Sequence, residues 1–169
     1  MKLTRFFQVI PLFICCSLLS VPPAAGVTAD VNFSGKWSLN EDKSDLGEGR
    51  FFAASRLTIT QDGNSITIER TRAGRDGEER TTSETVTLDG KENVTETDNR
   101  KTTSTAVWSE DQTVLTIKST MEFSRQGETM EMIRTEVLSL DGEGKVLTIK
   151  SGSSSARGES SAILVYDKE

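Results

Sequence analysis

Short stretches of alternating apolar and polar residues recur along the chain from about residue 34 onward. In the first clear example, Leu57 and Ile59 alternate with Thr58 and Thr60. A period of two places the apolar side chains on one face, which is typical of a half-buried antiparallel strand. Thr, Val and Ile, which favour strands, are abundant in these stretches. The same pattern returns at 66–69, 85–88, 115–118 and 147–150.

Turn signals separate the alternating stretches at short intervals. The clearest are the Asp-Gly pairs at 62–63, 76–77, 89–90 and 141–142. Glycine tolerates the positive φ that tight hairpin turns require. No long stretch with helical periodicity follows residue 29. The pattern predicts about ten strands, near 34–39, 55–61, 65–72, 80–88, 92–98, 101–108, 113–120, 129–140, 145–151 and 160–167.

Consecutive strands joined by short turns predict a meander with one apolar face. Such a sheet buries that face and loses its exposed edges by closing on itself. We therefore predict an all-β fold, an antiparallel up-and-down meander β-barrel of about 8–10 strands. The apolar parity changes between Val137 and Leu138, which predicts a β-bulge in that strand.

One connection, from about Asn40 to Ala54, is longer than the others. It contains two glycines and the apolar run that begins with Phe51 and Phe52. We expect a loop that crosses one end of the barrel, with Phe51 or Phe52 plugging it. The alternative is a mobile lid over a ligand portal.

The beginning of the chain has the three parts of a secretory signal. A basic start with Lys2 and Arg5 precedes a 14-residue apolar run (6–19) and a region rich in small residues. A membrane-spanning helix needs about 20 apolar residues, which argues against an anchor. We predict a signal peptide over 1–29, cleaved after Ala29 or, as an alternative, after Gly26. The remaining domain, 30–169, is expected to be secreted or periplasmic, with no transmembrane segment.

Residue types that are missing exclude several chemistries. Both cysteines, Cys15 and Cys16, lie in the predicted signal peptide, so no disulfide framework is expected in the domain. The chain has no histidine, which excludes Ser-His-Asp and Cys-His catalysis, ordinary zinc sites and histidine-ligated haem. Phosphate-loop and dinucleotide motifs are missing too. We expect no enzyme activity, no metal and no cofactor.

The charge of the domain excludes a further class of partner. The whole chain has a net charge of −6, and removal of Lys2 and Arg5 with the signal peptide makes it −8. An acidic chain does not bind nucleic acid by neutralising phosphates. Charged residues concentrate between Glu69 and Arg80, with Arg70 and Arg72 among them. Their pattern is typical of a solvated edge with cross-strand ion pairs.

The Gly35-Lys36-Trp37 motif, at the first strand of a predicted exported barrel, resembles the lipocalins and the wider calycin superfamily. The fuller string from Phe33 through Asn40 is similar to uncharacterised bacterial secreted proteins of lipocalin-like type. The resemblance implies a barrel closed at one end by Trp37, with a late basic residue packed across it. Arg157 and Lys168 are the two candidates for that residue.

The chain departs from these families in ways that bear on its ligand. Lipocalins have eight strands and a C-terminal helix, whereas ten strands resemble the intracellular fatty-acid-binding proteins. Those proteins carry an inward arginine two residues before a tyrosine in the last strand. Leu164 stands at that distance from Tyr166, so their carboxylate clamp is missing.

Aromatic residues and methionines supply the candidate ligand contacts. We predict a non-enzymatic exported protein that holds a small apolar or amphipathic ligand in the barrel. The alternative is a structural module with a filled core that binds another exported protein, in which case the same side chains simply fill the core. The candidate ligand-binding residues are Phe51, Phe52, Trp108, Phe123, Met132 and Tyr166, and Gly35 and Trp37 form the barrel-closing motif.

Overall fold

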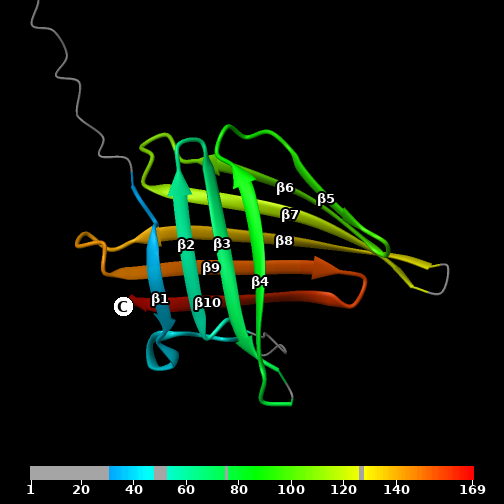
Figure 1. The fold of residues 1–169 in the computed structure, drawn as a ribbon, viewed down its shortest axis with the longest axis horizontal. Helices are drawn as coiled ribbons and strands as arrows, with labels where there is room; N and C mark the ends of the chain where they lie inside the picture. Colours follow the sequence, from blue (N-terminus) through cyan, green and yellow to red (C-terminus); the bar gives the residue numbers. More distant parts are fainter. Residues whose placement is uncertain (1–30, 48–52, 75, 126–127) are drawn as a thin grey trace, which may run out of the picture.

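The computed structural model describes residues 31–47, 53–74, 76–125 and 128–169, drawn in colour in Figure 1. The predicted signal peptide and the candidate residues Phe51 and Phe52 lie outside these ranges. The described part is all-β apart from one short 3-10 helix, η1. Its elements are β1 (Gly35–Leu39), η1 (Glu41–Lys43), β2 (Arg56–Asp62), β3 (Ser65–Ala73), β4 (Glu79–Thr87), β5 (Asn93–Thr97), β6 (Arg100–Trp108), β7 (Val114–Arg125), β8 (Glu128–Leu140), β9 (Val146–Ser155) and β10 (Gly158–Lys168).

The ten strands form one antiparallel sheet that is nearly closed into a barrel, which confirms the predicted fold class. The strand order is β4-β3-β2-β1-β10-β9-β8-β7-β6-β5. Figure 1 shows β2, β3 and β4 crossing over the long strands β6 to β10. Every strand pairs with its neighbours in sequence, except that β1 also pairs with β10 and β4 does not pair with β5. The pairing of β1 with β10 therefore joins the first and last strands of the sheet. A seam without backbone pairing is left between β4 and β5.

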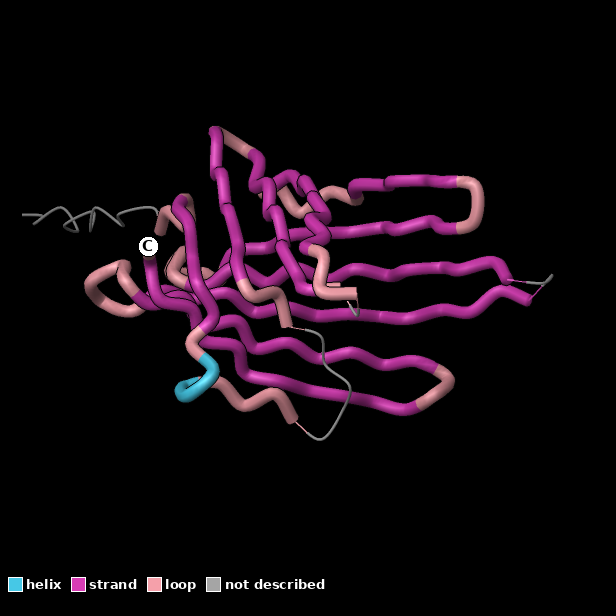
Figure 2. Tube along the Cα trace, turned by 60° about the horizontal axis from the view of Figure 1, so that its bottom comes forward, coloured by secondary structure: helices cyan, strands magenta, loops and turns pink. Residues whose placement is uncertain are grey.

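Three strands extend beyond one of their predicted bounds by two or more residues. β7 continues to Arg125, β9 continues to Ser155, and β10 begins at Gly158. The added part of β9 contains serines and a glycine, which have low strand propensity. It stays extended because it pairs with β8 on one side and with β10 on the other. Figure 2 shows the long hairpins reaching past the rest of the sheet at one end.

The bulge predicted in β8 is wrong. The register with β7 runs without interruption from Ser139 to Glu128, and the register with β9 runs from Leu140 to Met132. Leu138 is buried, and the side chains on its face at positions 136 and 134 are Glu136 and Arg134. The apolar parity ends there because the inner face of the barrel becomes charged.

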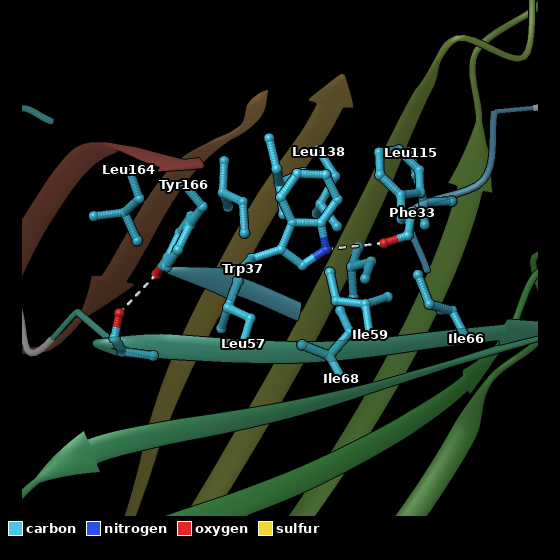
Figure 3. Close-up of a cluster of buried hydrophobic side chains, with 14 of the residues drawn as sticks. Phe33, Trp37, Leu57, Ile59, Ile66, Ile68, Leu115, Leu138, Leu164 and Tyr166 are labelled. Carbon is cyan, nitrogen blue, oxygen red and sulfur yellow. Dashed lines mark hydrogen bonds between the residues drawn. The ribbon is translucent and has the colours of Figure 1, made fainter. Parts of the chain in front are cut away.

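An apolar core fills one end of the barrel. Trp37 is fully buried, and its indole Nε1 donates a 3.1 Å hydrogen bond to the carbonyl oxygen of Phe33. Figure 3 shows this indole between Leu57 and Ile59 on one side and the side chains of β7 and β8 on the other. Contacts from both layers of strands fix the two halves of the sheet together at this end. The core also includes Ile66, Ile68, Val86, Ala106, Leu115, Ile117, Leu138, Leu147, Ile149, Leu164 and Tyr166.

Candidate ligand-binding cavities

The inner face of the barrel changes along the strands from apolar to polar, and on β3 and β8 it becomes charged. On β3, Ile66 and Ile68 are buried in the core, and the same period of two places Arg70 and Arg72 on the same face further along. The inner face of β8 changes in the same way, since Glu136 and Arg134 precede the buried Leu138 on the same face. The side chains at the second end of the barrel therefore come from the same strands as the core, but many of them are polar and several carry charge.

Two arginines and two glutamates form a buried network across this charged end. Arg70, on β3, donates to Glu136 on β8 over 2.8 Å and to Glu84 on β4 over 3.2 Å. Arg134, also on β8, donates to Glu84 over 2.9 Å. The side chains of Arg70 and Glu136 are each only 7% exposed. Charges this deeply buried must be paired, and the network pairs two cations with two anions.

Glu84 links β4 to the opposite wall of the barrel. Besides the two arginines, it accepts hydrogen bonds from the hydroxyls of Ser104 on β6 (2.9 Å) and Ser119 on β7 (3.2 Å). Burial raises the pKa of Glu84, but Arg70, Arg134 and the two hydroxyls together outweigh burial and lower it. The ionised carboxylate thus holds together strands that no backbone ladder joins.

Two further arginines point into the same region without an anionic partner among the described residues. The Nε atom of Arg72 is buried and has no hydrogen-bond partner there. The guanidinium of Arg100 lies 5.4 Å from the ring centroid of Phe123 and donates to the sulfur of Met121 over 3.4 Å. Desolvation, followed by the repulsion of Arg70 and Arg134, lowers the pKa of Arg72. Arg72 is half-buried, whereas Arg100 is exposed. Among the described residues that line this end of the barrel, arginines outnumber carboxylates.

Two cavities occupy the charged end. The larger, of about 600 Å³, lies along the seam and is lined by residues of β3 to β8. The smaller, of about 290 Å³, lies between β2, β3, β8, β9 and β10. Arg70, Arg72, Met121 and Arg134 line both and so form a shared wall. The remaining residues of the larger cavity are Thr82, Ser83, Glu84, Thr85, Asn93, Thr95, Thr97, Arg100, Thr102 and Ser104.

The sequence-predicted ligand residues are divided between the core and the cavities. Met132 and Tyr166 line the smaller cavity, where the Tyr166 hydroxyl donates to the carbonyl oxygen of Ala54 over 3.1 Å. Trp108 stacks on Phe33 in the core, with ring centroids 5.7 Å apart. Phe123 lies under Arg100 and lines neither cavity. Burial is the main reason that the pKa of Tyr166 rises to about 12.

The barrel-closing motif has the neighbours that the resemblance implies. The Lys168 ammonium lies 5.1 Å from the ring centroid of Trp37, so this lysine, rather than Arg157, packs across the indole. Gly35 has a φ of 151° and lies so close to the Lys168 side chain that an added Cβ would be 2.9 Å from its Cε. The backbone angle favours glycine here, and a Cβ would also force the flexible end of the Lys168 side chain to shift.

The solvated edge predicted between Glu69 and Arg80 is only partly present. Arg80 pairs with Asp76 at the surface, but Arg70 is buried and Arg72 is half-buried. Reading the strand period from Ile66 and Ile68 onward would have placed both of these arginines inside the barrel.

Neither a membrane-spanning helix nor a metal-binding cluster is found in the described residues. In these ranges no helix is long and apolar enough to cross a membrane. The same residues contain no cluster of three or more carboxylates or cysteines that could hold a metal ion.

Comparison with known proteins gives a likeness to solved structures alone. No protein-family model matches the chain, and no curated protein matches it. Among solved structures, the chain is similar to zebrafish ileal bile acid-binding protein complexed with cholic acid. The TM-score is 0.47 and the sequence identity 20%, over 81% of this chain and 98% of that chain. The chemistry of the cavities is therefore argued only from the residues that line them in this chain.

Proposed function

We propose that this protein is an exported, non-enzymatic binding barrel that holds a small amphipathic ligand in its interior. The observation that carries the proposal is the division of the barrel into a filled apolar end and a hollow polar end. A cavity of about 600 Å³ lies within the usual range for small-molecule sites. The apolar core continues directly into it along β3, β6 and β7, so a bound molecule would meet both kinds of surface.

The character of the cavity lining favours an amphipathic ligand over a purely apolar one. Most apolar side chains pack in the core, and the larger cavity is lined mainly by hydroxyls and guanidiniums. A purely apolar molecule would leave these polar groups without hydrogen-bond partners. The same cavity weighs against the alternative of a filled-core module that acts only through its surface. Export is proposed from the predicted signal peptide.

Native mass spectrometry of the protein exported by a bacterial host and gently purified tests this function. We expect a discrete added mass that is lost on organic extraction, or one that appears on incubation with a panel of fatty acids and other amphiphiles. A ligand that binds only the folded state should also raise the melting temperature. A mass that stays unchanged with every amphiphile would refute the proposal.

A pair of matched variants shows whether the ligand is inside the barrel. Thr102 and Thr103 are adjacent on β6, but only Thr102 lines the larger cavity. Thr102→Phe should fill the cavity and abolish ligand binding, whereas Thr103→Phe should leave it unchanged. Equal binding by both variants would place the ligand elsewhere.

A further inference from the structure

The charge inside the barrel is opposite in sign to the charge of the whole chain. The whole sequence has a net charge of −6. Four arginines (Arg70, Arg72, Arg100 and Arg134) but only two glutamates (Glu84 and Glu136) line the two cavities. Arginine on an exposed face needs no explanation beyond solubility. Arg100 is exposed, but Arg70, Arg72 and Arg134 are fully or partly buried and outnumber the two glutamates. An excess of buried arginine in an acidic protein does need an explanation, because desolvating an unpaired cation costs free energy.

The ion pairs of the network show which cations are in excess. Glu84 pairs with Arg70 and Arg134, and Glu136 pairs with the same two arginines. Both carboxylates therefore form their ion pairs with the guanidiniums of Arg70 and Arg134. Among the described residues, Arg72 and Arg100 have no ion pair.

Arg72 is the better placed of the two unpaired cations to meet a ligand. Its side chain lies in the wall shared by the two cavities, and its buried Nε has no hydrogen-bond partner among the described residues. Arg70 and Arg134 repel it, and Glu136 attracts it without forming an ion pair with it in the described part of the chain. The larger cavity is also lined by Thr82, Thr95 and Thr102, whose hydroxyls can donate to an anion.

We infer that the ligand of the barrel is an organic anion, whose carboxylate, sulfonate or phosphate group binds Arg72 in the wall between the two cavities. This inference rests on the proposed function and adds the chemical class of the ligand. An anionic group satisfies the free guanidinium donors and removes the excess charge, and charge-assisted hydrogen bonds of this kind are strong. The apolar part of the ligand then lies along Met121, which also borders both cavities.

Two fluorescent probes that differ only in the anionic group test the inference. They are 1-anilinonaphthalene-8-sulfonate and its uncharged parent, 1-anilinonaphthalene. We expect the wild-type protein to bind the sulfonate at least about tenfold more tightly, as one charge-assisted contact suffices for that ratio. Inorganic sulfate should compete with the sulfonate probe and not with the uncharged one.

The variant Arg72→Gln locates the site. It should weaken binding of the sulfonate at least about tenfold and change binding of the uncharged probe by less than about twofold. The matched control is Arg157→Gln, in the exposed turn between β9 and β10, which should change neither. Because Arg72 has no ion pair among the described residues, its replacement leaves no described carboxylate unpaired, and we expect R72Q to remain folded. If R72Q does not fold, sulfate competition in the wild-type protein decides the question.

The outcomes separate this inference from the function on which it rests. If neither probe binds the wild-type protein, the proposed function fails and the inference fails with it. If both probes bind equally well, and neither R72Q nor sulfate alters their ratio, the protein is a ligand-binding barrel but the anion site is wrong. Selective loss of the sulfonate in R72Q supports both.

Discussion

Glu84 offers the sharpest test of the charged network, because its carboxylate joins β4 to three strands across the barrel. Replacement by glutamine keeps the shape of the side chain and its ability to accept from Ser104 and Ser119. It removes the charge that faces Arg70 and Arg134, and its amide can turn N–H donors toward guanidinium donors. The variant Glu84→Gln therefore isolates the electrostatic part of the contact.

The expected loss of stability follows from the two ion pairs. Two unit charges about 4 Å apart at an effective dielectric constant of about 20 attract by roughly 4 kcal/mol. The side chains of Glu84 and Arg134 are both 21% exposed, which weakens their attraction, and Glu84→Gln also relieves the desolvation of the carboxylate. Breaking a buried pair costs about 3–5 kcal/mol. We expect a loss of about 3 kcal/mol and a fall in melting temperature of about 10 °C.

The control is the same substitution on the same strand at the surface. Glu79 pairs with Arg56 over 2.6 Å, but these side chains are 59% and 52% exposed. Surface pairs contribute about 0–1 kcal/mol, so Glu79→Gln should be nearly neutral. Urea unfolding followed by tryptophan fluorescence measures both variants. Equal losses in E79Q and E84Q would refute the view that burial makes the network strong.

The pH dependence of the same variant gives an independent check. The pKa of Glu84 is lowered in the folded protein, so the stability it contributes is present above its ordinary value of 4.5. That contribution is lost as pH falls through the lowered folded pKa, because the unfolded state binds the proton first. The difference in stability between the wild-type protein and E84Q should therefore shrink as pH falls below 4.5. A constant difference would contradict the assignment.

Three further predictions concern the core and the barrel-closing motif. Tyr166 is the one tyrosine of the chain, and its pKa of about 12 should appear as a single absorbance transition near pH 12; about 2–3 kcal/mol of stability should be lost between pH 10 and 12, since the unfolded tyrosine ionises first. A transition near pH 10 in the folded protein would show that Tyr166 is not buried. Leu138→Ala should cost about 2–5 kcal/mol in urea unfolding, whereas Ile163→Ala, at a side chain 41% exposed, should cost much less. Gly35→Ala should cost at least about 1 kcal/mol, because its φ of 151° disfavours a Cβ and because Lys168 must move; a stability equal to wild type would show that the lysine packing is loose.

The fold was predictable because the signal for each strand lies within a short segment of the sequence. Alternation such as that of Leu57 and Ile59, with Asp-Gly turns between strands, is enough to count ten strands and to order them as a meander. The ends of β9 and β10 were not predictable, because the serines from Ser151 to Ser155 have low strand propensity and are extended only by their neighbours.

The charged site was only half visible in the sequence. The strand period places Arg70 on the inner face, but charged side chains are usually exposed, and a solvated edge was the simpler interpretation. Its partner Glu136 lies 66 residues away in the sequence. Glu136 is on β8, which is not adjacent to β3 in the sheet and faces it only when the barrel has formed. The apparent bulge in β8 has the same origin. When the inward residues of a strand change from apolar to charged, the remaining apolar residues lie on the outer face. The sequence then looks as if the strand had turned over, unless the buried partners of the charged residues are known.

The pairing of β1 with both β2 and β10 has a consequence for when the protein can fold. β1 begins at Gly35, and its partner in β10 ends at Lys168, so the two strands that close the barrel come from opposite ends of the described chain. Trp37 pairs with Lys168 in that ladder, so the apolar end of the barrel cannot be sealed until the last residues have been synthesised. A contact between residues so far apart in the sequence forms slowly, because a long loop must close first. During synthesis, β1 is therefore left without one of its two partner strands until β10 has emerged from the ribosome.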